Sequence, residues 1–94
     1  MQKKQQLLIK FSNSFNKDRK VAPTAIKIAL RDALEIFRES PNNSSLRNHS
    51  LEKLGKRYFG LRSINVTDDW RAIYRKKENE IIFIMLNTHI QLYT

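Results

Sequence analysis

The sequence predicts an α+β fold in which two N-terminal helices pack on one face of a mainly antiparallel sheet. Apolar residues recur at a helical period between residues 26 and 37, and three strand-like runs follow in the C-terminal half. The expected order is strand–helix–helix–strand–strand–strand, with a short C-terminal tail. With 94 residues, the chain has room for a single domain, residues 1–94, with one two-layer core.

The N-terminal part begins with a strand candidate and a short helix. The strand spans Gln5 to Phe11 and is centred on the apolar residues 7–9. Ser12 or Ser14 is suited to cap a brief helix that carries Phe15, because a serine hydroxyl can accept a hydrogen bond from a free N–H of the first turn. This segment therefore predicts a tight strand-to-helix connection.

A second, longer helix is predicted after Pro23, which fits a first helical turn because the missing N–H is not needed there. Its apolar residues follow the i, i+4, i+7, i+8, i+11 pattern of one helical face: Ile26, Leu30, Ala33, Leu34 and Phe37. Charged residues occupy the other faces: Lys27, Arg31, Asp32, Glu35 and Arg38. We expect the apolar face to pack on the sheet.

The C-terminal half predicts three strands after the polar loop of residues 40–45. They span Tyr58–Val66, Trp70–Lys76 and Glu80–Leu86, and residues 77–79 suit a tight hairpin between the last two. Residues 81–86 are all apolar, which predicts that the last strand is covered on both faces, by the helices and by another segment. The rest of the second sheet face is expected to be partly open.

The chain is strongly basic, with 18 Lys and Arg against 9 Asp and Glu and a net charge of +9. Eight basic and two acidic residues lie between Lys53 and Lys77, so two thirds of the net charge is in this stretch. A solvated surface is the ordinary explanation for scattered charge, but this concentration favours a nucleic-acid partner. No cysteine and no membrane-length apolar run occur, so we expect a soluble, cytoplasmic protein.

The residue types that could do chemistry are few. His49 and His89 are the only histidines, and without cysteine they disfavour a zinc site. Asp68 and Asp69 are adjacent, so on a strand they would point to opposite faces and not share two metals. Two glycines exclude the common phosphate-cradling loops. The remaining possibility is metal-free acid–base cleavage of a phosphodiester, with histidines moving protons and arginines stabilising charge.

Each candidate also has a structural explanation. His49 and His89 could be surface histidines, and Asp69 could simply close a turn. Aromatic residues such as Trp70 and Tyr93 more often pack in a core than bind a ligand. The strand arginines, Arg62, Arg71 and Arg75, could be solvated charges that discourage edge pairing.

Three motifs together favour the catalytic interpretation. They are L-x-x-H-x-L at residues 46–51, Y-F-G-L-R-S-I-N-V-T-D-D-W-R-A-I-Y at 58–74 and I-I-F-I-M-L-N-T-H-I-Q-L-Y at 81–93. Their order and spacing resemble the RelE/ParE toxin superfamily, and most closely the YafQ-type RelE/StbE mRNA interferases of bacterial type II toxin–antitoxin systems. The run K-F-S-N-S-F-N-K-D at residues 10–18 resembles the first strand and helix of the same superfamily.

The resemblance implies a RelE-like microbial-ribonuclease fold and a metal-independent, cofactor-free endoribonuclease. It would cut translated mRNA in the A site of the 70S ribosome and leave a 2′,3′-cyclic phosphate. The resemblance also implies a cognate acidic antitoxin, in a possible toxin–antitoxin heterotetramer, and no membrane partner.

Residue by residue, the resemblance implies four catalytic positions. His89 is the candidate general acid, and Asp69 is either the base or the group that tunes an imidazole. His49 would be a second proton-transfer or phosphate-binding residue, and Tyr93 would position the base or phosphate. The expected RNA- and phosphate-binding residues are Arg62, Asn65, Trp70, Arg71, Arg75 and Lys76.

One position departs from the family pattern. YafQ-type members have a histidine on the strand before the D-W pair, where this chain has Asn65. Asparagine can hydrogen-bond a phosphate but cannot transfer a proton near neutral pH. Two alternatives therefore stay open: a ParE-like inhibitor of DNA gyrase, and a toxin-like protein that binds RNA or the ribosome without cutting. The two histidines favour the interferase branch over the gyrase inhibitor.

Overall fold

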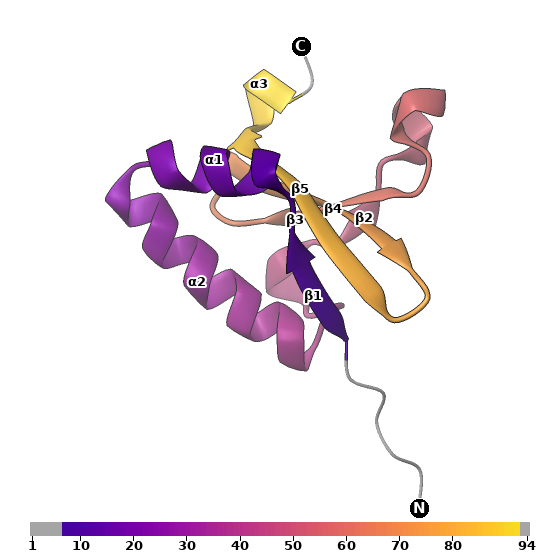
Figure 1. Cartoon of the computed structure of the whole chain (residues 1–94), viewed down its shortest axis with the longest axis horizontal. Helices are drawn as coiled ribbons and strands as arrows, with labels where there is room; N and C mark the ends of the chain where they lie inside the picture. The colour runs from indigo at the N-terminus through magenta and orange to yellow at the C-terminus, as the bar shows by residue number, and fades with distance from the viewer. Residues whose placement is uncertain (1–6, 93–94) are drawn as a thin grey trace, which may run out of the picture.

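The computed structural model describes residues 7–92 and shows two helices packed on a five-stranded mixed sheet (Figure 1). The strand order is β1-β5-β4-β3-β2, with β1 parallel to β5 and the other neighbours antiparallel. The elements are β1 (Leu8–Phe11), α1 (Asn13–Val21), α2 (Thr24–Glu39), η1 (Ser44–Leu46), β2 (His49–Ser50), η2 (Glu52–Leu54), η3 (Lys56–Tyr58), β3 (Leu61–Asn65), β4 (Trp70–Lys77), β5 (Glu80–Thr88) and α3 (His89–Leu92). The α+β fold predicted from the sequence is confirmed.

Local sequence signals set the ends of both helices. The hydroxyl of Ser12 accepts a hydrogen bond of 3.0 Å from the backbone N–H of Phe15, so Ser12 and not Ser14 caps α1. Pro23 immediately precedes α2, and its carbonyl accepts from the N–H groups of Ile26 and Lys27. It is therefore the cap of α2 and lies one residue outside the predicted first turn.

The main core lies between the helices and one face of the sheet. The predicted face of α2 packs there, with Leu30, Ala33 and Phe37 buried. Phe83 of β5, which lies between β1 and β4, is fully buried, and its ring centroid lies 5.3–5.8 Å from those of four other aromatic rings: Phe11, Phe15, Phe37 and Tyr74. Such ring contacts add directional preference to hydrophobic burial.

The carboxylate of Asp18 on α1 reaches the sheet, where it accepts a 3.0 Å hydrogen bond from the backbone N–H of Leu86. This bond joins residues that are 68 positions apart in the chain. It therefore fixes α1 against the C-terminal part of β5.

A bulge in β5 lets this strand serve two cores. Phe83 pairs with Tyr74 and Met85 pairs with Ile73, so Ile84 is the extra residue. Ile84 and Met85 pack on the second face, against a small core of Leu51, Leu61 and Ile73 with Tyr58, whereas Leu86 returns to the main core. The prediction that β5 is covered on both faces is thus confirmed, and the second cover comes from the segment after β2.

Several strand boundaries differ from those predicted. β5 continues two residues further, to Thr88, and β4 one residue further, to Lys77. β3 begins at Leu61, three residues later than predicted, because Tyr58 belongs to η3 and Gly60 turns the chain with φ +76°. Residues 49–50 form the short edge strand β2, which was not predicted. The hairpin is confirmed, with Glu78 at φ +56° between β4 and β5.

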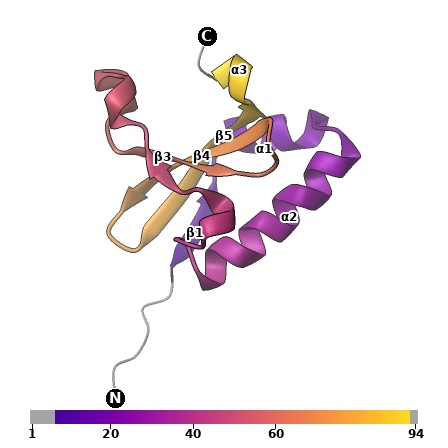
Figure 2. The ribbon, with the colours of Figure 1, turned by 180° about the vertical axis from the view of Figure 1, so that it is seen from behind.

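Seen from behind, the sheet has α1 and α2 at one side, whereas the segment from β2 to β3 projects at the other (Figure 2). The second face is therefore only partly covered, as predicted. Within residues 7–92, no helix is long and apolar enough to cross a membrane.

Candidate active site

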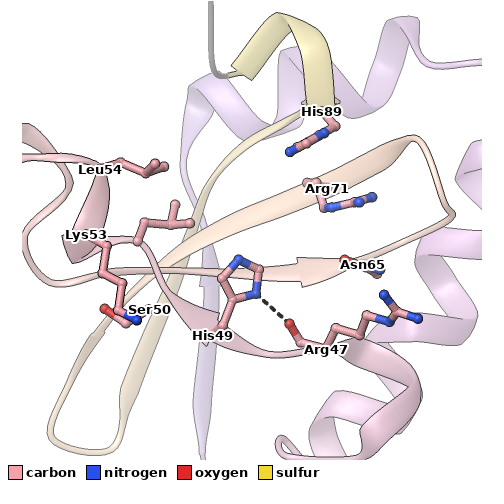
Figure 3. A pocket seen from close by; sticks show the side chains of 9 residues that line it. Arg47, His49, Ser50, Lys53, Leu54, Asn65, Arg71 and His89 are labelled. Atoms are coloured by element: carbon pink, nitrogen blue, oxygen red, sulfur yellow. Dashed lines mark hydrogen bonds between the residues drawn. The ribbon is translucent and has the colours of Figure 1, made fainter.

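A cavity of about 490 Å³ lies on the second face of the sheet, between the segment after η1 and the start of α3 (Figure 3). Asn65 of β3 and Arg71 of β4 lie on its sheet side, His89 lies at one end, and the β2 segment supplies the rest. Its lining residues are Arg47, His49, Ser50, Leu51, Lys53, Leu54, Asn65, Arg71 and His89. Two histidines and three cations from three separate parts of the chain thus meet in one cavity.

The imidazole of His49 is held by its own local backbone. Arg47 ends η1 in the left-handed conformation, with φ 46° and ψ 46°. Its carbonyl oxygen lies 2.7 Å from Nδ1 of the exposed His49 ring (Figure 3). A carbonyl can only accept, so Nδ1 carries a proton and donates it. In the neutral ring, Nε2 is then the nitrogen with a free lone pair.

His89 is the first residue of α3, directly after β5. Its backbone N–H donates a 2.6 Å hydrogen bond to the backbone carbonyl of Asp69, in the turn between β3 and β4. This bond fixes the start of α3 against the turn. The hydrogen bond that brings Asp69 and His89 together joins their backbones.

Arg71 fixes the same turn from inside the cavity. Its Nη1 donates to the carbonyl oxygens of Thr67 and Asp68, both at 2.8 Å, and to its own neighbour Trp70 at 3.2 Å. These bonds hold the guanidinium at the cavity wall. A planar guanidinium held in this way is a preorganised site for a phosphate.

The cavity is electrostatically one-sided. Three of its lining residues are the cations Arg47, Lys53 and Arg71, and none of the lining residues in the described part of the chain is acidic. Such a wall attracts a phosphate backbone. Across residues 7–92, no three histidine or carboxylate side chains are grouped as metal ligands, so we assign no metal ligand.

Four of the predicted site residues share this cavity: His49, Asn65, Arg71 and His89. Three polar or charged lining residues were not among the predicted ones: Arg47, Ser50 and Lys53. The main sequence feature that could have identified these three residues is their proximity to His49. Their segment, however, had no predicted secondary structure. Tyr93 lies outside the described residues.

The remaining predicted RNA-binding residues lie elsewhere. Arg62 and Lys76 line a separate hollow on the helix side, where Nε of Arg62 donates a 2.9 Å bond to Asn48. Trp70 is half-buried against the main core. Arg75 lines a hollow near the β4–β5 hairpin. None of these four lines the histidine cavity, and their role in RNA binding stays a prediction.

Strand alternation explains this separation for Arg62, Trp70 and Lys76. Asn65 and Arg62 are three residues apart on β3, so they point to opposite faces. Arg71 likewise points away from Trp70 and Lys76 on β4. Arg75 is on the same face as Arg71 but lies near the β4–β5 hairpin, away from the cavity.

Comparison with known families agrees with the sequence motifs. Residues 7–94 match the family described as bacterial toxin of type II toxin–antitoxin system, YafQ. The chain belongs to this toxin family. The resemblance inferred from the motifs is thereby confirmed. No curated protein sequence matches the toxin in a separate comparison.

Solved structures of similar shape support the same assignment of fold. A crystal structure of YafQ from E. coli is 24% identical, with a TM-score of 0.77, and the match covers 95% of the toxin and 100% of that chain. A crystal structure of the E. coli DinJ–YafQ complex has 27% identity and a TM-score of 0.71, over 95% and 100% of the two chains. The RelB–RelE antitoxin–toxin complex from Methanococcus jannaschii has 21% identity and a TM-score of 0.70, over 89% and 94%.

Proposed function

We propose that the toxin is a metal-independent endoribonuclease that cuts translated mRNA in the ribosomal A site. The observation that carries this proposal is the convergence of two histidines and three cations on one cavity. A phosphodiester needs a base and an acid for its two proton transfers, and cations for the charge on phosphorus. The family membership supports the same activity.

His49 is proposed as the general base. Its Nδ1 is bonded to the Arg47 carbonyl, so Nε2 can take the proton from a ribose 2′-hydroxyl. The 2′-oxygen then forms a bond to phosphorus as the bond from phosphorus to the 5′-oxygen breaks. This assigns to His49 the role that the sequence had left open between Asp69 and a histidine.

His89 is proposed as the general acid that, when protonated, gives its proton to the departing 5′-oxygen. The products are then a 2′,3′-cyclic phosphate and a 5′-hydroxyl. Arg47, Lys53 and Arg71 would stabilise the negative charge on phosphorus. Asn65 can hydrogen-bond a phosphate oxygen from the cavity wall but does not take part in proton transfer.

Asp69 is proposed to act on His89 and not directly on the RNA. The bond from the His89 N–H to the Asp69 carbonyl keeps the two residues adjacent. Asp69 would therefore hold the start of α3, and with it His89, in position at the cavity.

The test is a reconstituted translation reaction in which new mRNA ends are mapped and their chemistry is determined. Wild type should produce ribosome-dependent cuts with 2′,3′-cyclic phosphate ends, and His49→Gln and His89→Gln should not. Arg38→Ala, which removes an exposed cation of α2, is the control that should still cut. Inhibited translation without new ends would contradict cleavage and support the binding-only alternative. DNA damage signalling in cells that express the toxin, without new mRNA ends, would support gyrase inhibition.

We further propose that the toxin pairs with an acidic antitoxin in the cytoplasm. Similar structures include the DinJ–YafQ and RelB–RelE complexes, and a net charge of +9 suits an acidic partner. A small acidic protein encoded beside the toxin should co-purify with it and relieve growth arrest. Light scattering would show whether the pair is a heterodimer or a heterotetramer. Retained arrest in the presence of every adjacent acidic protein would contradict this proposal.

A further inference from the structure

The segment of residues 52–60, called here the basic arm, joins β2 to β3 and projects from the sheet on the side away from α2 (Figure 1, Figure 2). It contains the two short 3-10 helices η2 and η3. Gly55, at φ +129°, and Gly60, at φ +76°, lie before and after η3. Both backbone conformations favour glycine, and the space where a Cβ would lie is open at each position.

The arm is anchored at its base and exposed at its tip. Leu51 is buried and the half-buried Tyr58 packs against it in the small second core. In contrast, the side chain of Phe59 is 68% exposed and that of Leu54 is 53% exposed. Packing in the second core therefore accounts for the aromatic side chain of Tyr58. It does not account for the aromatic side chain of Phe59, which is exposed.

Several cations lie close to Phe59 in the sequence of the arm. Lys53, Lys56 and Arg57 lie on the arm with a single acidic residue, Glu52, and all four are exposed. The guanidinium of Arg57 lies 5.7 Å from the centre of the Tyr58 ring, which holds it near the aromatic side of the arm. Lys53 and Leu54 also line the histidine cavity, so the arm is continuous with the candidate active site.

We propose that the basic arm binds single-stranded RNA beside the cleavage site, with a base stacked on Phe59 and phosphates held by Lys56 and Arg57. This inference rests on the proposed function, because it extends the path of the same RNA. Alternating rings and cations are how proteins hold single strands without reading their sequence. An acidic peptide would need a strand edge or a long groove, and two three-residue helices provide neither.

Binding is tested with a short single-stranded RNA that carries 2′-O-methyl groups, because this RNA cannot be cut by attack of the 2′-oxygen. Fluorescence anisotropy of the full chain gives its Kd without any dependence on cleavage. Phe59→Ala should weaken binding about 5- to 150-fold, the range that one stacked base contributes, and Phe59→Trp should bind at least as well as wild type. Ile28→Ala removes another exposed apolar side chain, on α2, and should leave the Kd unchanged.

The proposed phosphate contacts are tested separately, by the salt dependence of RNA binding. For single strands, the slope of log K against log salt changes by about 0.7 for each phosphate neutralised. Lys56→Ala and Arg57→Ala should each reduce this slope by about that amount, while Arg38→Ala should not. Phe59 is exposed, so thermal melting of its variants should match wild type and exclude misfolding.

Three results would overturn the inference. The first is an unchanged Kd for Phe59→Ala, and the second is no binding of the methylated strand by wild type. The third is loss of binding to poly-glutamate, but not to RNA, in the arm variants, which would identify a surface for an acidic protein. None of these results bears on cleavage, since the mapped mRNA ends test the two histidines independently.

Discussion

The Nδ1 atom of His49 lies 2.7 Å from the backbone carbonyl oxygen of Arg47, a residue with left-handed backbone geometry. The two residues are joined by Asn48, so the contact is local and needs no distant partner. It orients the imidazole in the cavity and determines which ring nitrogen carries the proton. The Arg47 carbonyl thus orients the His49 ring and sets its tautomer, as a carboxylate does for many catalytic histidines.

The first prediction concerns the proton-transfer role of His49. His49→Gln should reduce ribosome-dependent cleavage by about 10²- to 10⁴-fold, the usual contribution of one general acid or base. The ring is exposed, so the free energy of unfolding should change by less than about 0.5 kcal/mol. Cleavage rates and urea unfolding measure the two effects. A variant that still cuts at the wild-type rate would remove His49 from the mechanism.

The second prediction separates the backbone of Arg47 from its charge. Glycine adopts φ 46° readily, so Arg47→Gly should keep the free energy of unfolding within about 1 kcal/mol of wild type and still reduce cleavage. Arg47→Val places a β-branched residue in a left-handed conformation and should destabilise by about 1–3 kcal/mol. Equal stability of the two variants would show that the left-handed turn is not maintained in solution.

The third prediction distinguishes the two faces of the sheet. Arg71→Ala should reduce cleavage strongly, because this guanidinium lines the histidine cavity. Arg62→Ala should leave cleavage unchanged and cost about 0.5–1.5 kcal/mol, since it removes the 2.9 Å bond to Asn48 on the other face. Arg75→Ala is the control, a cation on β4 outside the cavity. Cleavage loss in Arg62→Ala would place the RNA on the helix side.

The fourth prediction concerns the aromatic core. Phe83→Ala should destabilise the toxin by about 3–5 kcal/mol, because it empties a fully buried site among four other rings. This is a substantial part of the roughly 5–14 kcal/mol expected for a domain of this size. Phe59→Ala removes the same side chain from an exposed position and should change stability by less than about 0.5 kcal/mol. Urea unfolding of both variants measures the difference.

The fifth prediction concerns the bond between Asp18 and the N–H of Leu86. Asp18→Ala should cost about 1–3 kcal/mol, since it leaves a partly buried backbone donor without its acceptor. Asp32→Ala, an exposed aspartate on α2, should have little effect. Hydrogen exchange at Leu86 should accelerate in the first variant only. Unchanged exchange there would show that the bond does not form in solution.

Much of the fold could be predicted because its signals are local. The face of α2, the Ser12 cap and the β4–β5 hairpin each depend on residues within a few positions of one another. Local steric and hydrogen-bonding preferences decide such features before any tertiary contact forms. The last strand, apolar from residue 81 to 86, likewise indicated cover on both faces, and both cores are present.

The composition of the site could be predicted only in part. The motif order was enough to select His49, Asn65, Arg71 and His89, and the structure brings these four together. The motif order could not exclude Arg62 and Lys76 from the cavity, because it does not assign side chains to the two faces of the sheet. Nor could it reveal Arg47 and Lys53, which reach the cavity only because the segment after η1 adds β2 to the edge of the sheet.

The sequence alone thus determined the toxin family, the helices, the hairpin and the residue types available for acid–base chemistry. Only the tertiary structure decided which of them meet. Strand order, the bulge at Ile84 and the left-handed turn at Arg47 depend on pairings between residues far apart in the chain or on the packing around them. Such pairings depend on the free energy of the whole domain, which a local pattern does not contain.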